Sequence, residues 1–326
     1  MLLNKIISLD IQPFNAIWCM NCNDQMLVSV LQFYKINLIN YFLNYIHYYN
    51  FIKNKNIAIG AGIIKRCETY KLLNECGIIQ YEEYFNDNNQ YKIKEYINTG
   101  CPLIAFIDCY YEPLRNDAYM KKHYNHAIII YGYNDIECNF NIIEHEYYNS
   151  KKYLKTIISY NDFKLCQLGY YELNNFDYKT CSFIGFERNI FIKTDEKFIK
   201  EQYYEFLNEQ KEVFYSSLTN LEYFMDEFEK LKDNLLLDNS EYIVTHLGGL
   251  INTKIFDLYK NDIYMHINNE SLNNNRRILN YWNIFRGLTE KMNLKQQYNV
   301  MYHKKCIDLL RDIYELESLE ISKCIG

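Results

Sequence analysis

The chain has 326 residues, of which 49% are hydrophobic and 23% are charged, and its formal net charge is −6. This composition is close to that of ordinary globular proteins, which excludes a disordered chain. The acidic balance argues against a protein that binds nucleic acid by neutralising phosphates. With only 3 prolines and 11 glycines, a collagen-like or linker-rich protein is also excluded.

The cysteines and the amino-terminal segment bear on the cellular compartment. The chain has 11 cysteines, an odd number, and it is too long for a small disulfide-stapled scaffold. The first residues lack the apolar core of a signal peptide, and no window approaches the roughly 18 apolar residues of a membrane span. We therefore expect a reduced, cytoplasmic protein without a membrane segment, in which most thiols are buried small hydrophobes.

Helical and strand-like patterns alternate over the first part of the chain. Apolar residues at helical spacing predict a helix after Asp24, and two shorter helices are expected to end at Gly77 and Gly100. Ser159 has the side chain and position of an N-cap, so a further helix is expected to follow it. Apolar runs rich in β-formers predict strands over 102–111, 126–133, 140–148 and 182–192.

From about residue 196 the pattern becomes almost wholly helical. A long amphipathic stretch covers 198–231, and further helices are expected over 241–260, 271–292 and 298–321. Polar segments such as LLLDNS are expected to separate these helices. The expected fold class is α+β, with an α+β domain over 1–195 and an all-α domain over 196–326.

A Trp-Cys-x-x-Cys motif, WCMNC, occupies residues 18–22. It is typical of thioredoxin-like redox sites, whose thiols lie at a helix N-terminus. That fold also needs a βαβ lead-in and a proline facing the site, and here only seventeen residues precede the motif and the next proline is Pro102. A zinc site is disfavoured too, because no second Cys or His pair completes four ligands. The residues do not favour either reading.

A single cysteine nucleophile is the second candidate. Cys22 lies directly before the helix expected after Asp24, where the positive end of the helix dipole favours the thiolate. A cysteine nucleophile needs an imidazole as proton acceptor and a third group that orients it. His126 opens a predicted strand, and Glu144 lies on the next one, so a hairpin would bring the two side chains together.

The residues alone leave alternatives open. Cys22 is by default an ordinary buried thiol, and Cys19 could be the nucleophile in its place. His123 competes with His126 but lies in a charged loop. His145 competes with Glu144, and strand alternation predicts that only one of the two faces His126.

The segment 100–146, GCPLIAFIDCYYEPLRNDAYMKKHYNHAIIIYGYNDIECNFNIIEHE, resembles the amino-terminal domain of the butirosin biosynthesis protein H family. The stretch CNDQMLVSVLQFY from Cys22 is similar to the helix that carries that family's nucleophile. The resemblance covers roughly residues 10–195. The family is a papain-like offshoot related to bacteriocin-processing cysteine peptidases, and it is similar in outline to the amide synthase of closthioamide assembly.

The resemblance implies a papain-like fold in which a helix packs on an antiparallel sheet. It implies an acyltransferase that moves an acyl group from the phosphopantetheine thioester of a carrier protein onto an amine in natural-product biosynthesis. Cys22 would be the nucleophile, His126 the base and acid, and Glu144 the orienting group, although Asp is more frequent at that third position. Neither a metal nor a small-molecule cofactor is implied.

Other positions are less clearly matched to the family. The oxyanion-hole glutamine of the peptidase relatives has no clean counterpart, and Asn15 ranks before Gln12 and Asn21 as a substitute. Asp108 could position the amine or a water molecule, or it could cap its strand. The expected partners are a carrier protein and a small amine, whereas the oligomeric state, including a homodimer, stays open. A cysteine peptidase or amidase using water, and a non-catalytic scaffold that binds the carrier, are the alternative functions.

Overall fold

The computed structural model describes residues 5–17, 20–86, 88–145, 152–192 and 195–325. The chain folds into two compact units. The first comprises Met1–Tyr41 and Glu68–Thr194 and is called the sheet unit; the second comprises Phe42–Cys67 and Asp195–Gly326 and is called the helical unit. Among the described helices, none is both long and apolar enough to cross a membrane.

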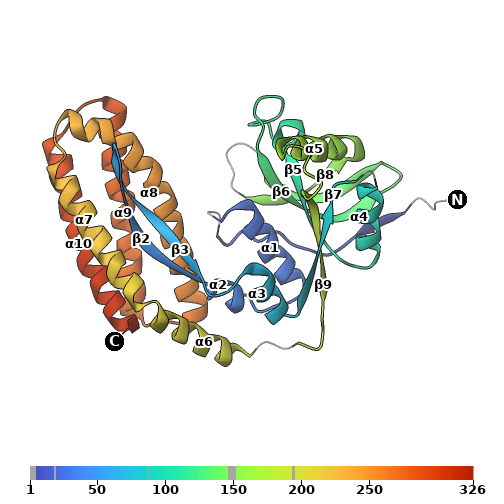
Figure 1. Cartoon of the computed structure of the whole chain (residues 1–326), viewed down its shortest axis with the longest axis horizontal. Coiled ribbons are helices and arrows are strands. Elements are labelled where there is room, and N and C mark those ends of the chain that lie inside the picture. Colours follow the sequence, from blue (N-terminus) through green and yellow to red (C-terminus); the bar gives the residue numbers. More distant parts are fainter. Residues whose placement is uncertain (1–4, 18–19, 87, 146–151, 193–194, 326) are drawn as a thin grey trace. The chain divides into compact units, whose positions relative to one another are not determined.

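The sheet unit is built on a seven-stranded sheet whose order is β4-β9-β5-β6-β7-β8, with β1 paired to β6 (Figure 1). Every pairing between these strands is antiparallel. Gly132 allows β1 to approach β6, because a Cβ at this position would lie 2.4 Å from the main-chain oxygen of Ile7. The strands are β1 (Ile6–Ser8), β4 (Ile78–Tyr84), β5 (Leu103–Asp108), β6 (Asn125–Asn134), β7 (Asn139–His145), β8 (Tyr153–Ser159) and β9 (Cys181–Arg188).

Helices cover the sheet and bury its apolar side chains. Ile93 and Ile97 of α4 and Phe163 of α5 belong to one buried cluster with residues of β5, β6 and β7, while α1 packs on β5 and β6. Ser159 caps α5 by accepting a hydrogen bond from the main-chain N–H of Asp162, which confirms the predicted N-cap. The helices are α1 (Cys22–Phe33), α2 (Ile39–Phe42), α3 (Thr69–Glu75), α4 (Asn89–Asn98) and α5 (Tyr160–Leu173), with a short 3₁₀ turn η1 (Cys109–Tyr111).

The helical unit consists of long helices and one β-hairpin (Figure 1). Tyr49 and Ile59 of the hairpin share a buried core with Trp282, Phe285 and residues of the other long helices. The indole N–H of Trp282 donates to the Tyr49 hydroxyl at 3.0 Å, so the hairpin is also held by a buried polar contact. The elements are β2 (Tyr45–Lys53), β3 (Ile57–Lys65), α6 (Glu196–Glu209), α7 (Lys211–Lys230), α8 (Asn234–Lys260), a π-helical turn η2 (Asn261–Met265), α9 (Asn269–Lys295) and α10 (Val300–Ile325).

The fold is a mixed α+β arrangement with an antiparallel sheet, and the described part of the chain after residue 195 is helical, as the sequence predicts. The ranges of the two units differ from the predicted division at 195. Residues 42–67 lie with the helical unit because the apolar side chains of this hairpin are buried among its helices. The stretch 198–231 forms two helices rather than one, and LLLDNS (235–240) lies inside α8 instead of ending a helix.

Candidate active site

Cys22 is the first residue of α1. Asn21 caps the helix, since its side-chain oxygen accepts the N–H of Asp24 at 2.9 Å. The first N–H groups of a helix have no partner within the helix, and together they form its positive end. The Cys22 thiol therefore lies where negative charge is favoured, next to N–H groups that can stabilise an oxyanion.

The antiparallel pairing of β6 with β7 brings His126 and Glu144 together. Ile129 pairs with Ile143, so continuing this register by one residue places Glu144 opposite Ile128. Side chains two residues apart on a strand share a face, and His126 therefore lies diagonally across from Glu144. The ring nitrogen Nε2 of His126 lies 2.9 Å from Oε1 of Glu144, and both side chains are buried.

The other side of the imidazole contacts the nucleophile candidate. The Cys22 thiol lies beside His126 and the main chain of Ala127, and hydrogen bonding from both lowers its pKa. Since Nε2 is engaged by Glu144, Nδ1 is the ring nitrogen that remains for sulfur. Cys22, His126 and Glu144 thus form a continuous chain of contacts from the start of α1 across two neighbouring strands.

The charges of these groups support one another. Burial raises the pKa of the Cys22 thiol, but the hydrogen bond and charge of His126 outweigh burial and lower this pKa below its usual value. For His126, burial opposes the charged form, but the Glu144 carboxylate and the Cys22 thiolate raise its pKa to about 10. Burial opposes the charge of Glu144 too, yet His126 and then Arg115 lower its pKa. At neutral pH the site therefore favours a thiolate–imidazolium pair held by a carboxylate.

Two further residues, the half-buried Arg115 and the buried Glu112, lie beside Glu144. The Arg115 guanidinium lies 3.6 Å from Oε1 of Glu144 and binds both carboxylate oxygens of Asp117 at 2.9 Å. Glu112 is fully buried, and burial followed by the charge of Glu144 raises its pKa well above the usual value. The carboxyl group of Glu112 is therefore favoured in its protonated form beside Glu144. Both carboxyl oxygens of Glu112 and Oε2 of Glu144 have no hydrogen-bond partner among the described residues. A proton on Glu112 gives Glu144 a neighbouring donor.

This protonation state gives a first prediction. Glu112→Gln keeps a neutral hydrogen-bond donor beside Glu144, so the dependence of Cys22 alkylation on pH is expected to stay within about twofold of wild type at every pH. Glu112→Ala removes the donor, and its profile is expected to move to higher pH because Glu144 then holds His126 less firmly. Iodoacetamide labelling followed by peptide mapping measures the rate at Cys22 alone. A shift of the Glu112→Gln profile as large as that of Glu112→Ala would show that Glu112 is ionised.

His145 lies close to the same site. Its main-chain N–H donates to Oε1 of Glu144 at 2.6 Å, and its ring centroid is 5.6 Å from that of His126. The expectation that only one of Glu144 and His145 would lie near His126 is therefore wrong, although of these two only Glu144 is hydrogen-bonded to it.

Within the part of the chain that the structure describes, this cluster is the candidate for holding a metal ion. Ligand atoms of His126, Glu144 and His145 lie within 4.8 Å of one another. The 2.9 Å contact between His126 and Glu144 is, however, a hydrogen bond that uses the lone pairs an ion would need. As arranged, these residues fit a proton-transfer site better than a metal centre.

The remaining predicted positions have other contacts. The amide of Asn15 bonds both main-chain polar groups of Tyr153, at 3.0 and 2.9 Å, and so fastens the amino-terminal segment to β8. Asp108 is fully buried and accepts hydrogen bonds from the N–H groups of Tyr110 and Tyr124. It also pairs with His123 at 2.6 Å. In the described contacts, neither Asn15 nor Asp108 bonds Cys22. Cys19, the alternative nucleophile, lies outside the described residues.

The sequence did not single out Arg115 or Glu112. Both lie after β5, in a segment without helical or strand periodicity, and only the fold brings them to Glu144. Glu112 lies in the run CYYEP, residues 109–113. A charged residue inside an otherwise apolar and aromatic run is the sequence feature that could have indicated a role for it.

No protein-family model matches the chain, and no curated protein matches it.

Proposed function

We propose that this protein is a cysteine-dependent acyltransferase that forms amide bonds in natural-product biosynthesis. Its sheet unit would be a papain-like domain similar to the butirosin biosynthesis protein H family. The observation that carries the proposal is the Cys22–His126–Glu144 chain, with a thiol at a helix N-terminus and an imidazole held by a carboxylate. Cysteine nucleophiles are activated in this way.

In the first half-reaction, the Cys22 thiolate attacks the carbonyl carbon of an acyl thioester on the phosphopantetheine arm of a carrier protein. The carbon–sulfur bond to the carrier breaks, and His126 gives its proton to the departing thiolate. The acyl group is then held as a thioester on Cys22. The main-chain N–H groups at the start of α1 stabilise the oxyanion, and loss of one such donor costs about 10²–10³ in rate in known enzymes.

In the second half-reaction, an amine attacks the acyl-enzyme. Neutral His126 takes the proton from the attacking nitrogen, the bond from carbon to the Cys22 sulfur breaks, and the amide leaves. Glu144 stabilises the imidazolium formed in this step. No metal or small-molecule cofactor takes part in this scheme. Transfer to the amine requires that water be kept from the acyl-enzyme.

The experiment mixes the purified full-length protein with acyl-carrier-protein thioesters and a panel of primary amines, and detects products by mass spectrometry. We expect an amide that depends on both the amine and Cys22. Release of free acid without any need for amine would replace the proposal with a thioesterase, peptidase or amidase that uses the same three residues. Carrier binding unchanged in Cys22→Ala, without product from wild type, would indicate a non-catalytic scaffold.

A further inference from the structure

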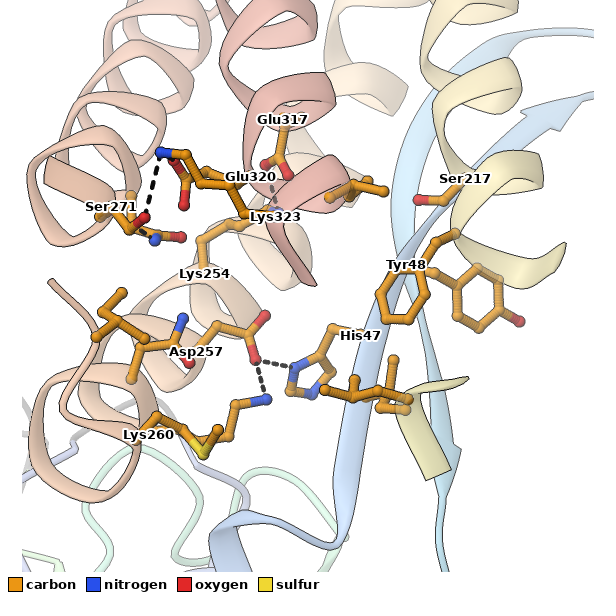
Figure 2. Close-up of a pocket in the computed structure, with 18 of the residues that line it drawn as sticks. His47, Tyr48, Ser217, Lys254, Asp257, Lys260, Ser271, Glu317, Glu320 and Lys323 are labelled. Carbon is orange, nitrogen blue, oxygen red and sulfur yellow. Dashed lines mark hydrogen bonds and ion pairs between the residues drawn. The ribbon is translucent and has the colours of Figure 1, made fainter. Parts of the chain in front are cut away.

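The helical unit contains a cavity of about 400 Å³, which lies within the range of small-molecule binding sites. Its wall is formed by β2, α6, α7, α8, α9, α10 and the turn after α8 (Figure 2). All of these elements belong to one unit, so the cavity is a property of this unit by itself. It is independent of the site around Cys22 and of the function proposed for that site.

Charged side chains line this cavity, although the core of the unit is apolar. Three lysine–carboxylate pairs are present on its wall: Lys254 with Glu317 at 2.6 Å, Lys260 with Asp257 at 3.0 Å, and Lys323 with Glu320 at 3.0 Å. The Lys254–Glu317 and Lys260–Asp257 side chains are at most 18% exposed, and apolar residues of similar size in their place are often as stabilising or more so. Stability alone therefore does not explain these two pairs around one cavity.

The described contacts use one oxygen of each of two carboxylates. Oε1 of Glu317 accepts from Lys254 and from the Tyr49 hydroxyl, both at 2.6 Å. Oδ1 of Asp257 accepts from Lys260 at 3.0 Å and from His47 at 2.9 Å. The second oxygen of each carboxylate has no hydrogen bond among the described contacts and is not a fully buried atom. Because both residues line the cavity, these oxygens can accept hydrogen bonds from a ligand. A lysine ammonium has three donor hydrogens, and Lys254 uses one of them on Glu317.

The aromatic residues of the wall favour an organic ammonium group. Lys254 lies 4.5 Å from the ring centre of Tyr49, and Lys260 lies 5.4 Å from that of Tyr203. The wall thus already holds two ammonium groups between a tyrosine and a carboxylate, and the ring of Tyr48 also lines the cavity. Burial opposes the charge of Asp257, but His47 and Lys260 lower its pKa, so this carboxylate is ionised at neutral pH.

Both signs of charge are present on the wall. Three lysines and three carboxylates line it, His47 bonds Asp257, and Lys323 is also paired with Glu270 outside the lining, so a ligand with a net charge of either sign meets like charges there. A ligand that carries both signs can place each of its charged groups against its opposite. Asp257 and Lys323 lie at separate places on the cavity wall (Figure 2). A ligand that contacts the polar groups at both places is therefore an extended molecule.

We propose that this cavity binds a small zwitterion that carries a protonated amine and a carboxylate. The amine contacts the open oxygens of Asp257 and Glu317. The carboxylate contacts Lys254 and takes the place of the Ser271 hydroxyl, 3.4 Å away, on Lys323, whose other contacts are to Glu320 and Glu270. The aliphatic part of the ligand packs against the tyrosine and aliphatic side chains of the wall.

Three probes with the same six-carbon chain and different ends test this proposal: 6-aminohexanoate, 1,6-diaminohexane and adipate. Titration calorimetry and thermal unfolding of the full-length protein are the measurements. We expect saturable binding and a rise in melting temperature with 6-aminohexanoate and neither effect with the diamine or the diacid. Binding of the diamine alone or the diacid alone, an equal response to all three probes, or no response to any would each overturn the proposal.

Substitutions of the lining residues test where 6-aminohexanoate binds. Lys254→Met and Glu317→Gln are each expected to weaken 6-aminohexanoate binding by about tenfold or more, as expected for loss of a hydrogen bond to a charged group. Lys323→Met changes a side chain that is 32% exposed, so it is expected to fold normally and still to weaken binding. Lys197→Met removes the exposed Lys197–Glu201 pair of α6 and is expected to leave binding unchanged. Equal binding by Lys323→Met and wild type would overturn the assignment of the carboxylate.

Discussion

Glu144→Gln is expected to lower the alkylation rate of Cys22 at pH 7 by on the order of tenfold or more, because one pKa unit corresponds to a factor of ten in thiolate. The Glu144 carboxylate, together with the Cys22 thiolate, raises the pKa of His126 to about 10 against the cost of its burial. Without the carboxylate the pKa of the buried imidazole falls, so less of it is charged at pH 7. Cys22 then loses the positive charge that lowers its pKa, and its reactivity moves to higher pH.

The dependence of Cys22 alkylation on pH shows the direction of this effect. Wild-type alkylation is expected to begin below the ordinary thiol pKa and to change again near pH 10, where His126 loses its proton. In Glu144→Gln a single rise at higher pH is expected. Acyl transfer is expected to fall by at least about 10²-fold, as when the orienting carboxylate of a triad is neutralised. The matched control is Glu187→Gln, which changes an exposed glutamate of the same unit. A wild-type profile in Glu144→Gln would mean that Glu144 does not act on His126.

Arg115→Met is expected to lower the free energy of unfolding by about 3 kcal/mol, in the range for breaking a buried ion pair by removing one partner. The Arg115 side chain is 11% exposed and faces the fully buried Glu144 and the partly exposed Asp117. Its removal leaves the charge of Glu144 balanced by His126 alone. Urea unfolding of the full-length protein, followed by fluorescence, measures the loss.

A double-mutant cycle separates this pair from general damage. If Arg115 balances Glu144, the variant that combines Arg115→Met with Glu144→Gln loses less stability than the two single variants together. Arg188→Met, at an exposed arginine of the same unit, is expected to cost under about 1 kcal/mol. Additive losses in the cycle would contradict the coupling of Arg115 to Glu144.

The three central residues could be predicted because their signals are local. Cys22 precedes a helix with a clear apolar pattern, and His126 and Glu144 lie on consecutive strands joined by a short turn. The roles assigned to them stay predictions, but their proximity follows from elements that the sequence indicates.

The surroundings of Glu144 could not be predicted in the same way. Glu112 and Arg115 lie in an irregular segment, and only the packing of the sheet unit brings them to β7. The resemblance makes Asn15 the first candidate to replace the oxyanion-hole glutamine of the peptidase relatives. Nothing in the sequence indicates that this amide pairs with the main chain of Tyr153, far along the chain.

The hairpin of β2 and β3 was missed for a related reason. The first strand, YIHYYNFIK, mixes tyrosines with polar residues, and the second, IAIGAGIIK, is an apolar run with two glycines, so neither shows a regular alternation of apolar and polar residues. Tyr49 gains its burial from Trp282, more than two hundred residues away in sequence. A pattern read along the chain does not reveal such a partner, and so residues 42–67 could not be assigned to the helical unit in advance.

The central claim is that Cys22 carries the acyl group, and intact-protein mass spectrometry tests it most directly. Wild type, Cys22→Ala and Cys19→Ala are each incubated with acyl-carrier-protein thioesters while amine is withheld. The account predicts an acyl adduct on wild type and on Cys19→Ala and none on Cys22→Ala. An adduct that persists in Cys22→Ala, or no adduct on wild type with any of the acyl groups, would contradict it.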